Sequence, residues 1–266
     1  MQSIAIFGIT GRMGQALIRA LQESSSPAFA LSGAIASPTS ARLGQDAAGS
    51  GKPTGVLITG DPAQGLLEAA VAVDFSVEGS VAAHASACAA AGIPILIGAT
   101  GLSAESRAAL ERTARHIAVL IAPNTSVGVG VAAKMVSMAA AALGPTFDVE
   151  IFEAHHRMKR DAPSGTALAL GEAVAQARGQ ALREVAVYAS AGAAGPRNPG
   201  SIGFSSLRAG DIVGDHTVVF ASSGERVEIT HRATDRLTFA RGALRAAEWL
   251  VGRPAGLYGM EQVLGL

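Results

Sequence analysis

Apolar residues in the first half of the chain gather in short runs, and each run is followed by a segment in which apolar residues recur at helical spacing. Short buried strands that alternate with amphipathic helices are typical of an α/β fold, in which helices cover both faces of a parallel sheet. The predicted strands cover residues 3–7, 29–36, 70–75, 93–97 and 117–121, and the predicted helices cover residues 13–22, 80–91 and 104–115.

The pattern changes after Asn124, where several strands follow one another with little helix between them. This order is typical of an α+β domain. The sequence therefore predicts two domains, 1–126 and 127–236, with a last amphipathic helix that returns to the first domain. In the second part we expect helices over 128–143, 164–178 and 237–251, strands over 147–154, 185–189, 202–207, 216–220 and 226–231, and a Gly/Pro-rich loop over 191–200.

Composition narrows the function classes. The chain has 266 residues, 49% of them hydrophobic, and 21 basic residues balance 21 acidic ones, so no nucleic-acid partner is expected. No 18-residue apolar stretch is free of glycine and charge, which argues against a membrane span. The single cysteine, Cys88, cannot form an intramolecular disulfide, and the N-terminus has no basic segment of the signal-peptide type. We expect a cytoplasmic protein.

Gly8, Gly11 and Gly14 stand at the first strand-to-helix turn with the spacing G-x-x-G-x-x-G. Glycines at such a turn let the backbone approach a pyrophosphate, whose charge is met by free N–H groups and the positive end of the helix. Arg12 lies in the turn and can reach a phosphate or a ribose. The pattern predicts a dinucleotide site, and the alternative is a tight turn without a ligand.

The end of the second predicted strand carries no acidic residue, although a dinucleotide site usually has one there for the ribose hydroxyls. Ala36 and Ser37 occupy the position. Ser37, Thr39, Ser40 and Arg42 could instead surround a 2′-phosphate, or Arg42 could be a solvated loop charge. The choice between NADH and NADPH therefore stays open.

Two further strand ends are expected to line the cofactor groove, Gly98–Thr100 and the segment from Ala122 to Ser126. Phe75, after another strand, could touch a nicotinamide ring, but core packing is the preferred interpretation. Cys88 is predicted to be a buried packing residue. His84 and His116 are predicted to be ordinary helix-surface or helix-end residues, and His231 is given no role.

The densest polar cluster runs from Glu153 to Ala167. Ser164 can cap the helix that follows, which leaves the amides of Gly165 and Thr166 to bind a carboxylate. His155 titrates near neutrality and can supply a proton, and Lys159 is a second donor or a carboxylate partner. These groups describe a pocket for a small, multiply anionic substrate. The alternatives are a solvated loop and a metal site, which the flanking cations disfavour.

The run E-x-H-H-x-x-K-x-D-x-P-S-G-T-A from Glu153 to Ala167 resembles the signature of the 4-hydroxy-tetrahydrodipicolinate reductase family, formerly called dihydrodipicolinate reductase. The GRMG, GATG and NTSVGV segments that begin at Gly11, Gly98 and Asn124 agree, as do residues 202–220 and 224–244. The resemblance covers nearly the whole chain.

The resemblance implies a Rossmann-type nucleotide domain over 1–126, completed by residues 237–266, and a mixed α+β substrate-binding and tetramerisation domain over 127–236. It implies that NADPH or NADH delivers a hydride to C4 of the dehydrated substrate, giving tetrahydrodipicolinate for diaminopimelate and lysine synthesis. No metal is implied. It also implies His155 and Lys159 as proton donors, a dicarboxylate site at His156, Ser164, Gly165 and Thr166, and cofactor contacts at Gly8, Ile9, Thr10, Gly11, Arg12, Met13, Ser37, Arg42, Gly98, Ala99, Thr100, Ala122, Pro123, Asn124 and Thr125.

Other reductases of aspartate metabolism fit the residues less well. Aspartate-semialdehyde dehydrogenase needs a thiol nucleophile, and Cys88 lies in a small-residue helix. Aspartate or homoserine dehydrogenase does not call for this anion pocket. A regulatory nucleotide-binding protein without turnover would be expected to lose the acid cluster and keep the glycines, yet the chain has both.

Overall fold

A computed structural model describes residues 1–24, 28–188 and 195–266 of the chain. The chain divides into two compact units. The first contains Met1–Val127 and Arg236–Gly265, and the second contains Gly128–Asp235. The junctions lie within one residue of those predicted from the sequence.

The first unit is built on a seven-stranded parallel sheet with the strand order β12-β6-β5-β4-β1-β2-β3. The first strand forms because Ile4, Ala5, Ile6 and Phe7 are all buried, as strands covered on both faces require. The strands are β1 (Gln2–Phe7), β2 (Phe29–Ile35), β3 (Ile58–Thr59), β4 (Val71–Asp74), β5 (Ile95–Ile97), β6 (Ala118–Ile121) and β12 (Gly256–Tyr258).

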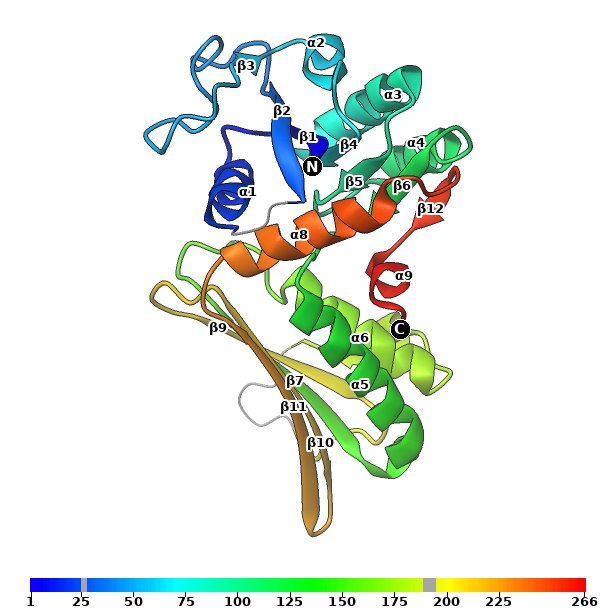
Figure 1. Cartoon of the computed structure of the whole chain (residues 1–266). Coiled ribbons are helices and arrows are strands. Elements are labelled where there is room, and N and C mark those ends of the chain that lie inside the picture. The colour runs from blue at the N-terminus through cyan, green and yellow to red at the C-terminus, as the bar shows by residue number, and fades with distance from the viewer. Residues whose placement is uncertain (25–27, 189–194) are drawn as a thin grey trace. The chain divides into compact units, whose positions relative to one another are not determined.

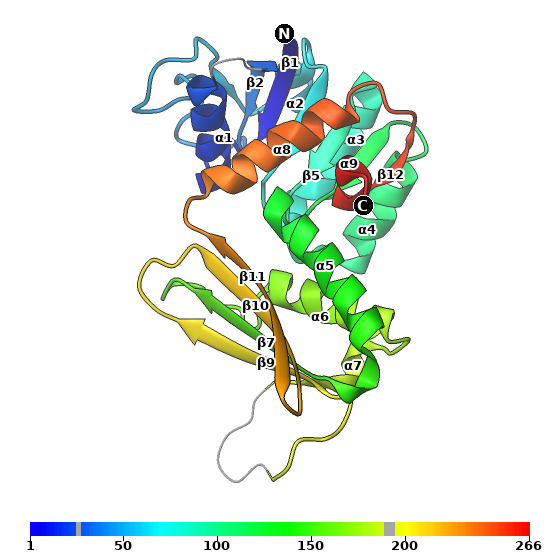
Figure 2. The same cartoon turned by 60° about the horizontal axis from the view of Figure 1, so that its bottom comes forward.

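Helices cover both faces of this sheet, and each face has its own core. Ile4 and Ile6 point into a core shared with α1 and α8, whereas Ala5 and Phe7 point into one shared with α3 and α4 (Figures 1 and 2). The helix α8, near the chain's end, therefore completes the first unit. The helices are α1 (Arg12–Glu23), α2 (Pro62–Leu66), α3 (Val81–Ala91), α4 (Ala104–Thr113), α8 (Leu237–Leu250), α9 (Met260–Leu264) and the 3₁₀ helix η1 (Glu78–Ser80).

The second unit is built on a five-stranded mixed sheet with the order β11-β10-β7-β9-β8. The middle strand β7 pairs antiparallel with β10 and parallel with β9. The helices α5 and α6 pack on one face, around Val136, Ile151, Val174 and Phe220. The elements are α5 (Val127–Leu143), η2 (Gly144–Thr146), β7 (Asp148–His155), α6 (Gly165–Ala177), α7 (Leu182–Val185), β8 (Ala186–Val187), β9 (Ile202–Arg208), β10 (Gly214–Ser222) and β11 (Glu225–Ala233).

The predicted fold class is confirmed, and the differences lie in short elements. The predicted strand 185–189 is largely wrong, because residues 182–185 form the helical turn α7 and only Ala186 and Val187 pair with β9. Residue 189 and residues 191–194 of the predicted loop lie outside the described part. Four short elements, β3, α2, β12 and α9, were not predicted, since two to five residues show no periodicity.

By length and composition alone, one helix in the described part of the chain, Val127–Thr146, is long and apolar enough to cross a membrane. This stretch contains glycines and Lys134, so it is not an apolar stretch free of glycine and charge. Val136 and Ala140 of this helix are buried in the core of the second unit, and Met135 and Met138 are exposed.

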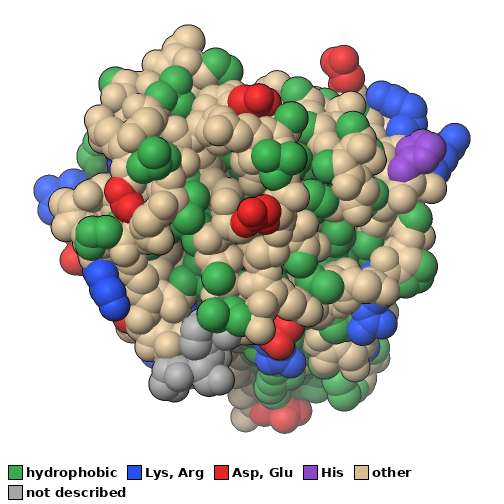
Figure 3. Space-filling view, turned by 45° about the horizontal axis from the view of Figure 1, so that its top comes forward, with side chains coloured by type: hydrophobic (Ala, Val, Ile, Leu, Met, Phe, Trp, Pro, Cys, Tyr) green, Lys and Arg blue, Asp and Glu red, His purple; other side chains and the backbone are tan. Residues whose placement is uncertain are grey.

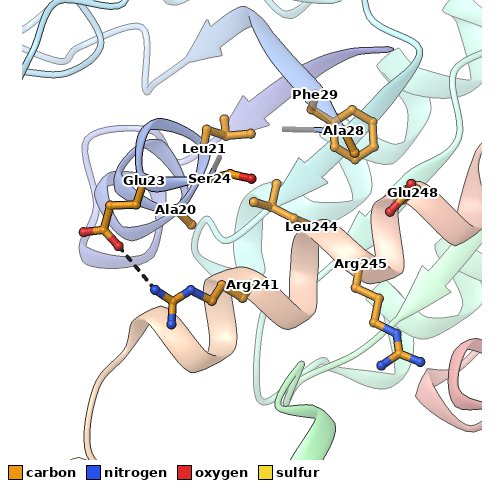
Figure 4. Close-up of a pocket in the computed structure, with 10 residues that line it drawn as sticks. All are labelled: Ala20, Leu21, Glu23, Ser24, Ala28, Phe29, Arg241, Leu244, Arg245 and Glu248. Atoms are coloured by element: carbon orange, nitrogen blue, oxygen red, sulfur yellow. Dashed lines mark hydrogen bonds and ion pairs between the residues drawn. The ribbon is translucent and has the colours of Figure 1, made fainter. Parts of the chain in front are cut away.

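A cavity of about 300 Å³ lies in the first unit, between the end of α1, the start of β2 and α8. Figure 4 shows Leu21, Phe29 and Leu244 around it, with the ion pair of Glu23 and Arg241 at its side, 3.3 Å apart. The cavity lies at the opposite end of α1 from the glycine turn, so it is not the predicted cofactor site. On the face shown in Figure 3, acidic and basic side chains are scattered and form no single basic surface.

Candidate active site

The glycine turn joins β1 to α1 in the form that a pyrophosphate site requires. Gly8 has a φ of +72°, a value that side chains disfavour, and its carbonyl accepts the N–H of Gly11 at 2.9 Å. A Cβ atom on Gly14 would lie 2.6 Å from backbone atoms of Gly8 and Ile9. The N-cap residue Gly11 offers α1 no side-chain cap, so amides of the first turn are available to an anion.

The predicted cofactor residues fall at the carboxyl ends of neighbouring strands. The amide of Gly98 donates to the carbonyl of Asp74 at 2.8 Å, and the amide of Ala122 donates to that of Ile97 at 2.8 Å. The ends of β1, β4, β5 and β6 therefore lie side by side, where ligands bind in open α/β sheets. Of the predicted contacts, Thr10, Gly11, Arg12, Thr100 and Pro123 are exposed, Gly8, Met13 and Asn124 are half-buried, and Ile9, Gly98, Ala99, Ala122 and Thr125 are buried.

The buried residues among these predicted cofactor contacts pack against or hydrogen-bond to other parts of the protein. Ile9 belongs to the core, and the hydroxyl of Thr125 donates to the carbonyl of Phe239 in α8 at 2.7 Å. The side chain of Asn124 accepts the amide of Ser126 at 2.9 Å. These contacts hold the strand ends in place, and a cofactor would meet the exposed neighbours and the backbone.

The loop after β2 presents hydroxyl groups. Ser37 is exposed, and its oxygen lies 2.9 Å from the hydroxyl of Thr39. Arg42 is half-buried, and its guanidinium donates to the carbonyls of Asp46 and Ala47 at 3.4 and 3.5 Å. Arg42 is therefore held by its own loop and is not a fully solvated charge.

In the second unit, Glu153 and His155 lie on the same face of β7, because side chains alternate along a strand. The Nδ1–H of His155 donates to Glu153 at 2.6 Å. Both guanidinium nitrogens of Arg208 donate to the same carboxylate, at 2.6 and 2.7 Å, and the amide of Ser164 donates to it at 3.2 Å. Because the carboxylate only accepts, it fixes the His155 tautomer and leaves Nε2 for a ligand.

The electrostatics of this group follow from burial and from its partners. Burial disfavours a charged carboxylate, yet hydrogen bonds from Arg208, Ser206 and His155 lower the pKa of Glu153 to about 2. Burial is the largest influence on the pKa of His155 and lowers it. The hydrogen bond and charge of Glu153 raise this pKa, the charges of Lys159 and Arg208 lower it, and the net shift is downward. Near neutral pH His155 is therefore mostly neutral before a ligand binds.

The N-terminus of α6 adjoins this group. Ser164 caps the helix by accepting the amide of Ala167 at 3.2 Å, and its hydroxyl lies 2.9 Å from Nε2 of His216 in β10. Burial, and then the nearby His155, lower the pKa of His216 to about 4. Gly165 is exposed, and nothing lies within 4 Å of where its Cβ would be. The first turn of α6 is thus open to a ligand carboxylate.

Lys159 and Asp161 form an ion pair with a 2.8 Å distance between Nζ and Oδ2. The amide of Lys159 donates to the carbonyl of His156 at 3.0 Å, so the two lie in one tight turn after β7. His156 and Thr166 are both half-buried. Among the described residues, no group of three or more His, Cys, Asp or Glu side chains is arranged to hold a metal ion.

Comparisons with known proteins cover both units. The profile described as "Dihydrodipicolinate reductase, N-terminus" matches residues 2–125, and the one described as "Dihydrodipicolinate reductase, C-terminus" matches residues 128–264. A 4-hydroxy-tetrahydrodipicolinate reductase of Acinetobacter baumannii (strain AYE) is 50% identical over 266 residues, which cover 99% of this chain and 96% of that protein. The chain belongs to the dihydrodipicolinate reductase family.

Other members of the family support the same assignment. The 4-hydroxy-tetrahydrodipicolinate reductase of Anaeromyxobacter dehalogenans is 47% identical over 268 residues, with 100% of this chain and 98% of that protein covered. A solved structure titled "Dipicolinate bound Dihydrodipicolinate reductase from Paenisporosarcina sp. TG-14" has the same fold, with a TM-score of 0.75, 24% identity, and coverage of 99% of this chain and 100% of that chain. The predicted family, the oxidoreductase class and the use of NADH or NADPH are confirmed.

Sequence reasoning missed three partners of the acid cluster in this family member. Glu153 was predicted to belong to the polar cluster but was given no role beside His155, although its spacing from His155 along a strand could have shown that the two side chains meet. Arg208 lies opposite His155 across the pairing of β7 with β9, and His216 lies opposite Glu153 across that with β10. The residue pattern along a single strand does not show which residues of another strand will pair with it, so these two partners could not be predicted.

Cys88 and His84 both lie in α3, and the structure shows the surroundings of each side chain. Cys88 is fully buried, and burial followed by the charge of Asp74 raises the pKa of its thiol, so the chain lacks the reactive thiol of a semialdehyde dehydrogenase. The prediction that His84 is an ordinary surface residue is wrong. Its ring is half-buried, stacks on Phe7 and binds Asp74.

Proposed function

We propose that this chain reduces 4-hydroxy-2,3,4,5-tetrahydrodipicolinate to tetrahydrodipicolinate, with His155 and Lys159 supplying the proton, in the diaminopimelate route to lysine. When bound, NADH or NADPH supplies the hydride that goes to C4 of the dehydrated ring. The observation that carries the proposal is the buried Glu153–His155 pair beside the open N-terminus of α6, in a chain of this family.

The first unit fits a nicotinamide nucleotide on its own geometry. The glycines permit the tight turn that a pyrophosphate site requires, because Gly8 has a positive φ and a Cβ on Gly14 would displace backbone. The uncapped start of α1 offers amides to that charge, and Arg12 lies exposed in the same turn. We assign the cofactor to this turn and to the strand ends at Ser37, Gly98–Thr100 and Ala122–Thr125.

The substrate carries two carboxylates, which the second unit is suited to bind. We assign one to the amides of Gly165 and Thr166 at the start of α6, with Ser164 fixing that turn. We assign His156 and Lys159 to the carboxylates as well, since each lies in the turn that follows β7.

Protonation of His155 is coupled to this binding. Two substrate carboxylates bring negative charge next to a ring whose Nδ1–H is already given to Glu153. An opposite charge favours the protonated form of a histidine, so the pKa of His155 rises when the substrate binds. The imidazolium then holds a proton at Nε2 for the reduced ring, and the Lys159 ammonium is a second source.

We also propose that the chain assembles as a cytoplasmic homotetramer through the second unit. The helices α5 and α6 cover only one face of its sheet. On the other face, Phe152 and Leu207 are 46% and 55% exposed. Large exposed apolar side chains on one sheet face are typical of an association surface. A single buried cysteine and a nicotinamide-dependent reaction suit the cytoplasm.

The test is turnover of enzymatically generated substrate, followed by oxidation of NADH and of NADPH. We expect turnover with at least one cofactor and a fall in kcat of ~10²–10⁴-fold in His155→Ala, the usual contribution of a general acid, with cofactor affinity retained. His116→Ala, an exposed helix-end histidine, is the control. Absence of turnover with both cofactors contradicts the function, and an unchanged kcat in His155→Ala contradicts the assigned role.

A further inference from the structure

The carboxyl end of β4 holds a buried acid–histidine pair that the proposed chemistry does not use. Asp74 is fully buried, and its Oδ2 accepts the Nδ1–H of His84 from α3 at 2.9 Å. Its Oδ1 accepts the backbone amide of Ser76 at 2.7 Å. The His84 ring stacks on the buried ring of Phe7, with 4.3 Å between centroids and 21° between planes (β4 and α3 are labelled in Figure 1).

This pair is not a nucleophilic relay. The hydroxyl of Ser76 lies 3.3 Å from Nδ1 of His84, the same nitrogen that binds Asp74. A Ser–His–Asp relay needs the serine on one ring nitrogen and the acid on the other. The polar contacts therefore act on the Phe75–Ser76 segment, because Asp74 accepts the amide of the peptide unit that joins these two residues and the Ser76 hydroxyl lies near His84.

The Phe75–Ser76 segment lies between two of the proposed cofactor strands. A Cβ on Gly8 would lie 3.0 Å from the carbonyl of Phe75 and from the amide of Ser76, so the glycine turn rests directly on this backbone. A Cβ on Gly98 would lie 2.1 Å from the Phe75 ring, so the turn after β5 rests on the side chain of the same residue. Any shift of the segment displaces both turns, because interiors are packed too closely to absorb it.

We propose that Asp74 and His84 are positioning residues for the nicotinamide cofactor: they fix the Phe75–Ser76 segment, and that segment sets where the turns at Gly8 and Gly98 stand. The inference rests on the proposed placement of the cofactor at these turns. An acid–histidine pair in a protein interior is weak evidence for stability, since apolar residues of similar volume often serve as well. The hydrogen bond from the Ser76 amide to Asp74 gives a geometric reason for an acid at the end of β4.

The test compares His84→Leu, which keeps ring-sized apolar volume but loses the hydrogen bond, with His84→Asn, whose side-chain amide can still donate to Asp74. We expect His84→Leu to raise the Kd of NADPH and NADH at least tenfold, as small misplacements of a binding site do. The KM for the substrate should stay within about twofold. His84→Asn should restore most of the cofactor affinity, and His116→Leu is the control in the same unit.

The outcomes separate this inference from the proposed function. If the wild-type chain binds neither cofactor, the proposed function itself fails. If the wild type binds and His84→Leu binds equally well, or if both variants lose cofactor and substrate affinity together with stability, the pair only supports folding and the positioning role is wrong. The free energy of unfolding in urea, measured on the same variants, distinguishes these cases.

Discussion

Replacing Glu153 by glutamine tests the centre of the acid cluster, because the change keeps the shape of the side chain and removes its charge. The carboxylate is nearly inaccessible, with 1% of its side chain exposed. It accepts hydrogen bonds from His155, from Arg208 twice and from the Ser164 amide. Glutamine offers one oxygen for these donors and turns an NH₂ group toward the remaining ones, so Arg208 loses its counter-charge in a buried setting.

The size of the effect follows from the shifted pKa. The pKa of Glu153 falls from 4.5 to about 2 on folding, which corresponds to about 3 kcal/mol in favour of the charged form. A carboxyl whose folded pKa is depressed contributes its full stability above the unfolded pKa of 4.5, and the contribution is lost as the pH falls toward the folded value. Glu153→Gln should therefore cost about 3 kcal/mol near neutral pH and about half as much at roughly pH 3.

Urea unfolding of wild type and variant, compared at neutral and acidic pH with equal m-values, measures this difference. The matched control is Glu228→Gln, an exposed carboxylate in β11 that pairs with Arg226 at 2.7 Å. We expect the control to change the free energy of unfolding by less than about 0.5 kcal/mol, since exposed ion pairs contribute little.

The same substitution also acts on His155, the proposed proton donor. Glu153 raises the pKa of His155, so its removal lowers that pKa further, and the alkaline limb of the kcat profile, where a general acid loses its proton, moves to lower pH. The reasoning is refuted if Glu153→Gln costs less than about 1 kcal/mol near neutral pH, or if the cost does not shrink on acidification while the control behaves as expected.

Two further predictions concern the cofactor and the assembly. Ser37→Glu places a carboxylate at the exposed end of β2, so we expect kcat/KM for NADPH to fall about tenfold relative to NADH, with Ser37→Gln as the control, and an unchanged ratio contradicts a ribose site there. Phe152→Glu puts a charge on the open sheet face, so we expect sedimentation to show four-chain wild type and smaller species for the variant, with Leu257→Glu as the control. A single-chain wild type, or an unchanged variant, contradicts the tetramer.

The strands of the first unit were predictable because burial on both faces leaves an unbroken apolar run, as in residues 3–7. The glycine turn was predictable because a positive φ at Gly8 and backbone contact at Gly14 each exclude side chains. The strands β3 and β12 were not predictable, because strands of two and three residues have no period and exist through their pairing with β2 and β6.

The candidate site likewise contains some residues that lie close together in the sequence and others that meet only through strand pairing. His155, Lys159 and the cap at Ser164 lie in one short stretch, so residue types and spacing were enough to propose them as parts of one site. Arg208 and His216 come from β9 and β10, which meet β7 only through sheet register. The Asp74–His84 pair likewise joins a strand end to the following helix. Its proposed role depends on the contacts that the turns at Gly8 and Gly98 make with the Phe75–Ser76 segment.

The protonation state of His155 shows why a residue's identity does not settle its role. By its type, histidine is an acid near neutral pH, and the sequence analysis used it as one. In the folded unit, burial and the charges of Lys159 and Arg208 together outweigh the Glu153 carboxylate, so the pKa of His155 is lowered and the ring is mostly neutral near neutral pH. Because the carboxylate accepts the Nδ1–H, a further proton goes to Nε2, and in the proposed function the dianionic substrate stabilises it there. On this reasoning, the substrate's own charge raises the pKa of the acid that would give it a proton, and a ligand without both carboxylates should bind without charging His155.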